Sequence, residues 1–356
     1  LFRSYHIQLL QALRPEFLHS VGNLHEYAHG IEVIEEDGNL IAARSVSPEG
    51  IRTLLPQEHG STLIQHQRTA IQLPFERGVR FIVLSGIGVG HALLMVQAQL
   101  EKQESAGALV WESDPYAWTA FFALFDAQRA IENTNRVFLF YSDTLLCRIG
   151  DWIRERYWFL FPAEKIAYLL GALPVMPKYT ERYVQEAKSL ASFLNREHDR
   201  FAPVVSEFLR CAQKVDANSA RSIWSCVSRD SYIHFPIAQA FLKGFAEMGF
   251  STFLQPHDRQ FGRNLEILGN LFEKRPDIIF SINLWPTAML YDLGLQRETI
   301  ESLRLIRIGW FVDDTLLYAD EGPLATLGEN DFVFCCDRSY LRSEERRVGK
   351  ECRSRW

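Results

Sequence analysis

A glycine-rich turn followed by two carboxylates is the first stretch of the chain whose residue types could bind a ligand. Three glycines alternate over five residues after the apolar run 81–85, and a second apolar run reaches residue 111. Glycines let the backbone approach a ligand, and the helix that follows offers unpaired N–H groups and a positive dipole end. A carboxylate at the tip of the second strand can accept hydrogen bonds from ribose hydroxyls. The pattern predicts a nucleotide-type βαβ unit, with the candidate binding residues Gly86, Gly88, Gly90, Glu112 and Asp114.

The glycine spacing leaves the ligand of this turn open. A dinucleotide motif has its third glycine where His91 stands, which disfavours a nicotinamide cofactor. The G-x-G-x-G spacing is similar to that of S-adenosylmethionine-dependent methyltransferases, but Leu84 occupies the place where those enzymes usually carry an acidic residue. A nucleotide-type fold that serves only as a scaffold is the alternative. Asp114 can also be the N-cap of the next helix, with Pro115 in its first turn.

Two adjacent carboxylates that end a later apolar run could act in catalysis. Asp313 and Asp314 follow the run 305–312, which places them at the carboxyl edge of a parallel sheet, where ligands bind. Either one is a candidate general base for a hydroxyl group, and capping of the next loop or helix is the alternative. A divalent ion at this pair would need a third ligand, so no metal site is predicted. The candidate substrate-binding residues of this region are Asn283, Trp310 and Asp337.

Strands that alternate with helices must position both groups of residues. The predicted strands of the first half are 81–85, 108–112 and 137–141, and those of the second half are 222–227, 252–255, 277–283, 305–312 and 331–336. Helices are predicted over 235–250 and 261–273. This alternation implies mostly parallel sheets with right-handed crossovers. The predicted fold is α/β, with two Rossmann-like domains.

The same patterns suggest where the domains divide. Residues 1–150 are predicted to form a Rossmann-like, nucleotide-binding-type domain with an N-terminal hairpin at 31–42, and 151–220 a helical connector. Residues 221–341 are predicted to form the second Rossmann-like domain. The segment 48–74 is polar and is predicted to be irregular. Asp143, just after the third strand, is predicted to cap a helix.

Composition limits the classes of function. The 356 residues are 47% hydrophobic and 23% charged, as in soluble globular proteins, and the length favours two domains. A net charge of −6 offers no basic footprint for nucleic acid, and no apolar run reaches the roughly 18 residues of a transmembrane helix. Six cysteines without a C-x-x-C pair predict reduced thiols and a cytoplasmic location.

The last fifteen residues, 342–356, differ from the rest of the chain. They have no apolar period and resemble an in-frame translation of a sequencing-adapter oligonucleotide. They hold six basic and three acidic residues, so the net charge without them changes from −6 to −9. A natural basic tail is the alternative. We therefore expect a non-native tail, and a native chain that continues beyond Leu341, of which this sequence is a fragment.

Two family resemblances follow from these motifs. Residues 30–145, with the glycine turn and the element Glu112-Ser113-Asp114-Pro115, are similar to the N-terminal region of the motility-associated factor family of glycosyltransferases. Residues 222–341 resemble the N-terminal domain of the spore-maturation (CgeB-like) glycosyltransferases, on strand 278–283, the element Trp310–Asp314 and the segment 331–337.

The resemblances imply a bacterial-type glycosyltransferase with two Rossmann-like domains in its catalytic part, the arrangement called GT-B. They imply a UDP- or GDP-type sugar donor, a glycan or protein acceptor, and Glu112 as a hydroxyl-binding residue. In such enzymes the C-terminal half usually holds the donor, so this chain would carry the acceptor half and be inactive alone. Helix N-termini and basic side chains, rather than a bound metal, would stabilise the departing diphosphate.

Overall fold

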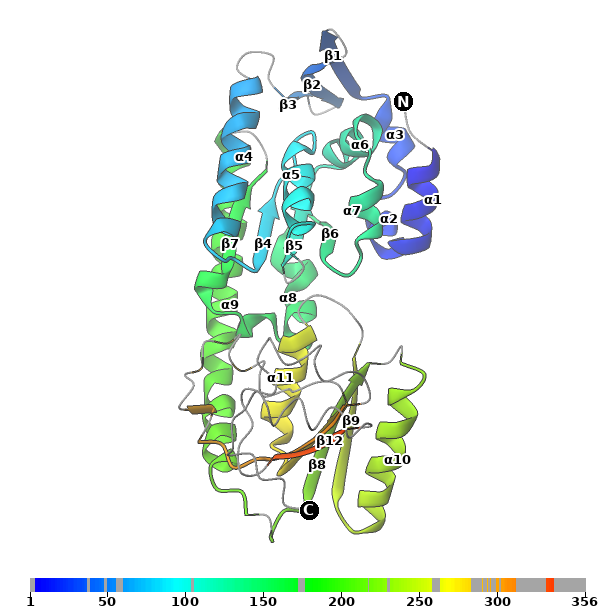
Figure 1. Cartoon of the computed structure of the whole chain (residues 1–356). Helices are drawn as coiled ribbons and strands as arrows, with labels where there is room; N and C mark the ends of the chain where they lie inside the picture. Colours follow the sequence, from blue (N-terminus) through cyan, green and yellow to red (C-terminus); the bar gives the residue numbers. More distant parts are fainter. Residues whose placement is uncertain are drawn as a thin grey trace, which may run out of the picture. The chain divides into compact units, whose positions relative to one another are not determined.

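The computed structural model has an α/β fold with two parallel sheets. It describes residues 4–36, 39–47, 50–55, 60–103, 106–171, 177–216, 218–228, 231–257, 263–282, 290, 293, 295, 299–300, 302–311 and 331–335. The chain forms two compact units, residues 1–197 with 260–262, and residues 198–259 with 263–356. Figure 1 shows the elements of both units. The predicted fold class is therefore confirmed.

The first unit begins with short helices and an antiparallel sheet. Helices α1 (Ser4–Leu13), α2 (Pro15–Val21) and α3 (Leu24–Ala28) come first, and Pro15 opens α2 because a missing N–H costs nothing at that position. Strands β1 (Ile31–Glu36), β2 (Asn39–Ser47) and β3 (Gly50–Leu55) then pair in chain order. The predicted hairpin is confirmed by the antiparallel pairing of β1 with β2.

The prediction of an irregular segment over 48–74 is wrong. It contains β3 and most of α4 (Gly60–Glu76). Helix α4 buries Ile71 and Phe75, one turn apart, and turns polar residues such as Gln72 outward. The polar composition therefore reflects an amphipathic helix rather than a loop.

Four parallel strands form the main sheet of the first unit. They are β4 (Phe81–Ser85), β5 (Gly107–Glu112), β6 (Val137–Tyr141) and β7 (Ile166–Leu170), in the order β6-β5-β4-β7. The first three were predicted, but β7 lies within the segment predicted to be wholly helical. It pairs with β4 from Phe81↔Ile166 to Ser85↔Leu170. As an edge strand it is only partly buried, so its sequence gives a weaker apolar signal than that of a central strand.

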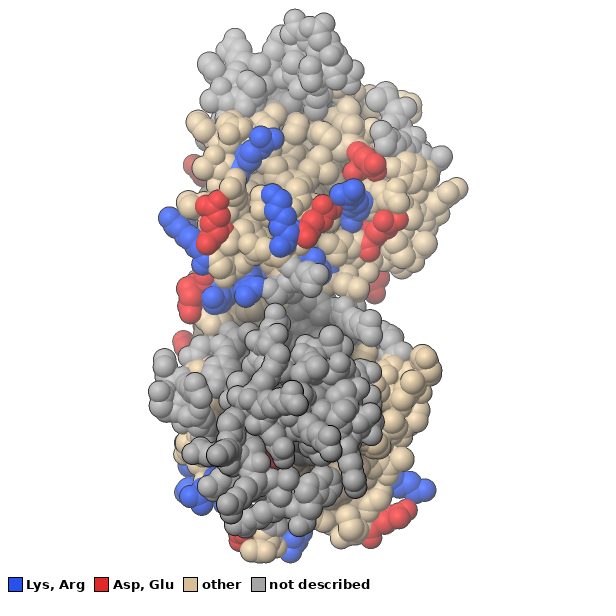
Figure 2. Space-filling view, viewed as in Figure 1, with Lys and Arg blue, Asp and Glu red and all other residues tan. Residues whose placement is uncertain are grey.

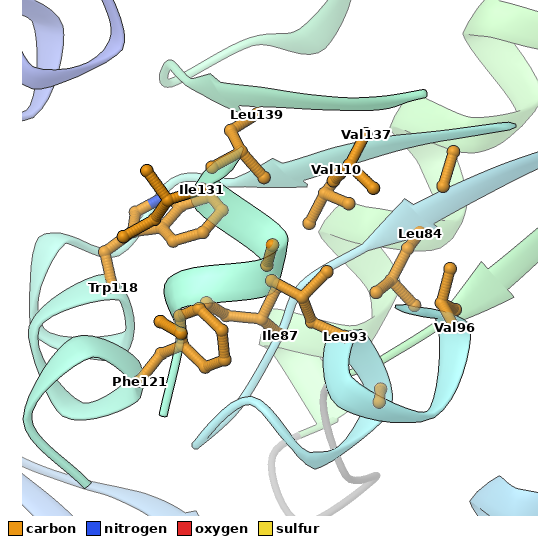
Figure 3. Packing of buried hydrophobic residues seen from close by; sticks show 14 of the residues in the cluster. Leu84, Ile87, Leu93, Val96, Val110, Trp118, Phe121, Ile131, Val137 and Leu139 are labelled. Carbon is orange, nitrogen blue, oxygen red and sulfur yellow. The ribbon is translucent and has the colours of Figure 1, made fainter. Parts of the chain in front are cut away.

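Helices pack around this sheet and close its core. They are α5 (His91–Leu100), α6 (Pro115–Leu124), α7 (Gln128–Glu132) and α8 (Leu145–Glu155), followed by the short 3₁₀ helices η1 (Trp158–Leu160) and η2 (Ala163–Lys165). Trp118 and Phe121 of α6 are fully buried in one cluster with Val110 and Leu139 of the strands (Figure 3). The aromatic side chains of α6 therefore belong to the core of the first unit.

Helix α9 (Pro177–Ala212) is 36 residues long, and the boundary between the two units falls within it. The second unit then alternates strands and helices: β8 (Ser222–Ser228), α10 (His234–Glu247), β9 (Ser251–His257), α11 (Arg263–Lys274), β10 (Ile278–Ile282), β11 (Ile306–Phe311) and β12 (Asp331–Cys335). Its sheet is parallel throughout, in the order β12-β11-β10-β8-β9. All five predicted strands are confirmed.

Candidate functional site

The carboxyl end of the first parallel sheet is organised around the buried carboxylate of Glu112. This last residue of β5 is fully buried. Its Oε2 accepts a hydrogen bond from the Ile87 N–H at 2.9 Å, and its Oε1 accepts one from the Asp114 N–H at 2.8 Å. The hydroxyl of Tyr183, on α9, also donates to Oε1. Burial of a carboxylate is costly unless it is hydrogen-bonded, so these three donors keep Glu112 in place.

The Glu112 carboxylate therefore binds the glycine turn itself. Ile87 lies between the first two glycines of the turn that was predicted to approach a ligand, and its N–H donates to Glu112. Both oxygens of Glu112 already accept hydrogen bonds from this chain. A ligand hydroxyl would have to share or replace those bonds.

The glycine turn is packed closely against the rest of the first unit. Gly90, the N-cap of α5, has φ +108°, and a Cβ added there would lie 2.1 Å from Cδ2 of Phe121. A Cβ added at Gly171, just after β7, would lie 2.1 Å from the carbonyl oxygen of Gly86. Residues 85–90 are all buried, and Ile87 points in among Phe121 and Leu93 (Figure 3). The glycines thus permit close packing of protein against protein.

Asp114 has the capping role that was the alternative to ligand binding. It is the N-cap of α6, and its Oδ1 accepts a hydrogen bond from the Tyr116 N–H at 2.9 Å, with Pro115 at the first helical position. Its side chain is almost completely buried. This geometry accounts for the Asp-Pro pair without a ligand.

Asp143 does not cap α8, contrary to the prediction. The N-cap is Thr144, without a side-chain cap bond, and Oε2 of Glu186 on α9 accepts from the Leu145 N–H at 3.2 Å. Arg182 instead donates to the backbone oxygen of Asp143 and lies 3.9 Å from its carboxylate. A carboxylate from a distant helix therefore satisfies the N-terminus that a local residue was expected to cap.

Helix α9 supplies the residues that the sequence did not associate with this edge. Arg182, Tyr183 and Glu186 lie on neighbouring turns and contact the ends of β5, β6 and the start of α8. Tyr183 is fully buried, with its ring 4.9 Å from that of Trp111. The available signal was a tyrosine at an otherwise aliphatic helical position, which indicates a buried hydroxyl in need of a partner.

Two titratable groups near this edge have shifted pKa values. Burial, followed by the charges of Tyr27, Asp143, Asp114 and Glu112, raises the pKa of Tyr141 above its usual value. Burial lowers the pKa of His91, the first residue of α5, below its usual value. Both shifts favour the neutral side chain at physiological pH.

The candidates of the second unit are only partly described. Asn283, Asp313, Asp314 and Asp337 lie outside the described residues. Trp310 is near the end of β11, partly buried, between its register partners Ile282 on β10 and Phe334 on β12. The three strands that precede the candidates are therefore adjacent and parallel.

Further observations bear on the class of protein. Among the described residues, no group of three or more His, Cys, Asp or Glu side chains is placed to hold a metal ion. None of the helices in the described part of the chain is both long and apolar enough to cross a membrane. On the face drawn in Figure 2, basic and acidic side chains are interspersed over the first unit. No family model and no curated protein sequence matches the chain.

Proposed function

We propose that this chain is a glycosyltransferase-like protein whose sugar-handling residues gather at the carboxyl edge of the second parallel sheet. In this proposal Asp313 or Asp314 is the general base for an acceptor hydroxyl, and Asn283, Trp310 and Asp337 bind substrate. The donor is a UDP- or GDP-type nucleotide sugar, and the acceptor is a glycan or a protein.

One observation supports the proposal most directly. Strands β10, β11 and β12 are neighbours in one parallel sheet, with Ile282 paired to Trp310 and Phe311 paired to Cys335. Trp310 lies within β11, and the other candidate residues follow the three strands by one to three positions in the sequence. Ligands of open parallel sheets bind outside the carboxyl ends of the strands, so adjacent strand ends are the arrangement that a shared site requires.

The test is turnover of a panel of UDP- and GDP-sugars by the full-length product of the gene that encodes this chain. We expect hydrolysis or transfer from at least one donor. Replacement of the general base, by Asp313→Asn or Asp314→Asn, should lower kcat by roughly 10²–10⁴-fold. Asp151→Asn is the matched control, because that carboxylate is exposed on α8 in the first unit.

The outcomes separate enzyme from scaffold. Absence of turnover with every donor would remove the enzymatic proposal, whatever the fold. Turnover that survives both aspartate substitutions would leave a transferase but would reject these two residues as the base.

For the first sheet we propose a structural rather than a catalytic role. Support comes from Glu112, whose oxygens accept bonds from Ile87, Asp114 and Tyr183, and from the close packing around the glycines. A methyl-donor site is the competing proposal, because the turn has the glycine spacing of methyltransferases. Calorimetry with S-adenosylmethionine distinguishes the two. We expect no heat of binding, whereas binding that disappears in Glu112→Ala would favour the methyl-donor site.

A further inference from the structure

The two faces of the second sheet differ in chemistry. Helix α10 covers one face, where Phe241 stacks on Phe280 of β10 with ring centroids 3.7 Å apart. Helix α11 covers the other, where the Lys274 ammonium lies 5.5 Å from the ring centre of Phe253 on β9. The two helices lie on opposite sides of the strands in Figure 1. We call these surfaces the α10 face and the α11 face.

The α10 face is apolar up to the carboxyl ends of the central strands. Side chains alternate along a strand, so Ile278, Phe280 and Ile282 of β10 share this face, and all three are buried. Ile306, Ile308 and Trp310 continue it on β11. This is the usual composition of a buried parallel sheet.

The α11 face changes from large apolar to small and polar residues toward the same edge. Trp224 of β8, paired with Phe253 and Ile279, forms a large apolar row. Two positions later the registered residues are Gln255 on β9, Cys226 on β8, Ser281 on β10 and Gly309 on β11, which we call the polar row. All four are buried. Ser228 and His257 follow as the last residues of β8 and β9.

Two polar atoms on this face have no partner among the described residues. Gln255 is 9% exposed, and its Nε2 donates to the backbone oxygen of Glu266 on α11 at 3.3 Å, but its Oε1 accepts no hydrogen bond from the described part of the chain. The buried Oγ of Ser228 is likewise unpaired within the described ranges. A buried polar group without a partner costs free energy, so each one calls for a specific explanation.

The location of these atoms points to a ligand. Strand β8 has β9 on one side and β10 on the other, so the chain reverses its direction of winding at β8. In open parallel sheets this switch point, at the carboxyl ends of the strands, is where ligands bind. The polar row and Ser228 lie at that end of β8, on the α11 face.

We propose that the polar row, together with Ser228 and His257, binds an uncharged, polyhydroxylated group such as a hexose ring. An amide oxygen and a serine hydroxyl match the donors and acceptors of sugar hydroxyls, and the residues of the row carry no formal charge that would select a phosphate. The choice of a sugar rests on the proposed function, and it places the sugar ring at β8–β9 beside the proposed catalytic edge.

The test measures binding of free sugars, without any nucleotide donor, to the chain itself. Saturation-transfer NMR with the methyl glycosides of glucose, galactose, mannose and N-acetylglucosamine should give a signal for at least one sugar. Inorganic phosphate is the charged comparison and should not compete. Ser228→Ala and Gln255→Met should weaken binding roughly 2- to 10-fold each, the size of one neutral hydrogen bond.

Ser225→Ala is the matched control. Ser225 is in the same strand, is fully buried and also has an unpaired Oγ within the described ranges, but it lies on the α10 face. We expect the Ser225→Ala variant to bind the methyl glycoside with the same affinity as the unchanged protein. Thermal unfolding should verify that all three variants remain folded. The signal in the unchanged chain is a readout that does not depend on the folding of any variant.

Two results would overturn the inference. One is no signal with any glycoside. The other is binding that Ser228→Ala and Gln255→Met leave unchanged, in which case an ordered water alone satisfies these atoms. Glycoside binding without nucleotide-sugar turnover would leave the polar row as a sugar site and reject the transferase. Nucleotide-sugar turnover that Ser228→Ala and Gln255→Met leave unchanged would keep the transferase and reject the polar row as its sugar site.

Discussion

At the scale of single residues, Glu112 illustrates how far the amino-acid type predicts a role. The sequence indicated a carboxylate at the end of a buried strand, next to a glycine turn, and the structure places it there. It could not indicate that Tyr183, 71 positions away, would donate to that carboxylate. The chemistry of the residue was predictable, but its partner depended on how a distant helix packs.

The bond between Tyr183 and Glu112 yields the first prediction. Tyr183→Phe removes one donor from a fully buried carboxylate and leaves the ring in place. We expect the free energy of unfolding to fall by about 1–3 kcal/mol, because the buried carboxylate loses the hydrogen bond from Tyr183 while Oε1 keeps the bond from the Asp114 N–H. Urea denaturation measures it.

Tyr168→Phe is the control for this prediction. Tyr168 lies on edge strand β7 and is 37% exposed, and its replacement should change stability by less than about 0.5 kcal/mol. Equal effects of the two substitutions would mean that the Glu112 contact contributes nothing specific.

His91 predicts a dependence of stability on pH. Burial lowers its pKa in the folded chain, so the unfolded chain takes up the proton first as the pH falls. The contribution of neutral His91 is therefore complete above its unfolded pKa of about 6.5, and it is lost as the pH falls from there toward the lowered folded pKa. In His91→Asn, the loss of stability between about pH 7.5 and pH 5 should be smaller than in the unchanged chain.

Chemical denaturation at several pH values measures this slope. Gln8→Asn, at an exposed position of α1 and without a titratable side chain, is the comparison and should keep the slope of the unchanged chain. If His91→Asn also keeps the full slope, protonation of His91 does not contribute to it.

At the scale of elements, replacement of glycine by alanine should have opposite effects on stability in the glycine turn and in helix α10. Gly90→Ala places a side chain on a backbone with φ +108° and against Phe121. We therefore expect the free energy of unfolding to fall by at least about 2 kcal/mol. Gly244→Ala, within helix α10, adds a methyl group that meets nothing within 4 Å. It should raise stability by about 0.5–1 kcal/mol.

Thermal and urea unfolding of both variants measures these changes. If Gly90→Ala is as stable as the unchanged chain, α5 begins differently and the close contact with Phe121 is not present. Because the same substitution is made at both sites, a difference between the two variants reports the local requirement for glycine at position 90.

Most elements were predictable because their apolar patterns are strong. Strands β4, β5, β8 and β10, each with a neighbour on both sides, have buried side chains throughout or nearly so, and each was found from the sequence. The missed elements are β3, β7 and α4, and the described side chains of β7 and α4 are only partly buried. A partly buried edge strand with Tyr168 and Leu170 facing outward has no pattern that separates it from a helix.

At the scale of the whole molecule, the sequence predicted two parallel sheets but not their strand orders. Order depends on which strands pair over long separations, and β7 had not been identified at all. The sequence predicted candidate residues near the ends of three strands, β10, β11 and β12. The structure shows that these three strands are neighbours in one sheet. The polar row was not foreseen, because it exists only once registers align Gln255, Cys226 and Ser281.

The sheets predict a pattern of hydrogen exchange across the molecule. Strands β4 and β5 in the first sheet, and β8 and β10 in the second, have a paired strand on both sides and are mostly buried. Their amides should exchange most slowly, while the edge strands β7 and β12 should exchange faster because one side of each lacks a strand partner in the described sheets. Mass spectrometry of exchanged peptides tests this order. Uniform protection across a sheet would contradict it.

The two strand orders also bear on the origin of the chain. In the first parallel sheet the third strand lies beyond the second, whereas in the second parallel sheet the third strand lies beside the first. A tandem duplication of one ancestral unit would have reproduced the same winding twice. The two parallel sheets therefore differ in topology, so a residue's role in one sheet says nothing about the role of the residue at the matching position in the other.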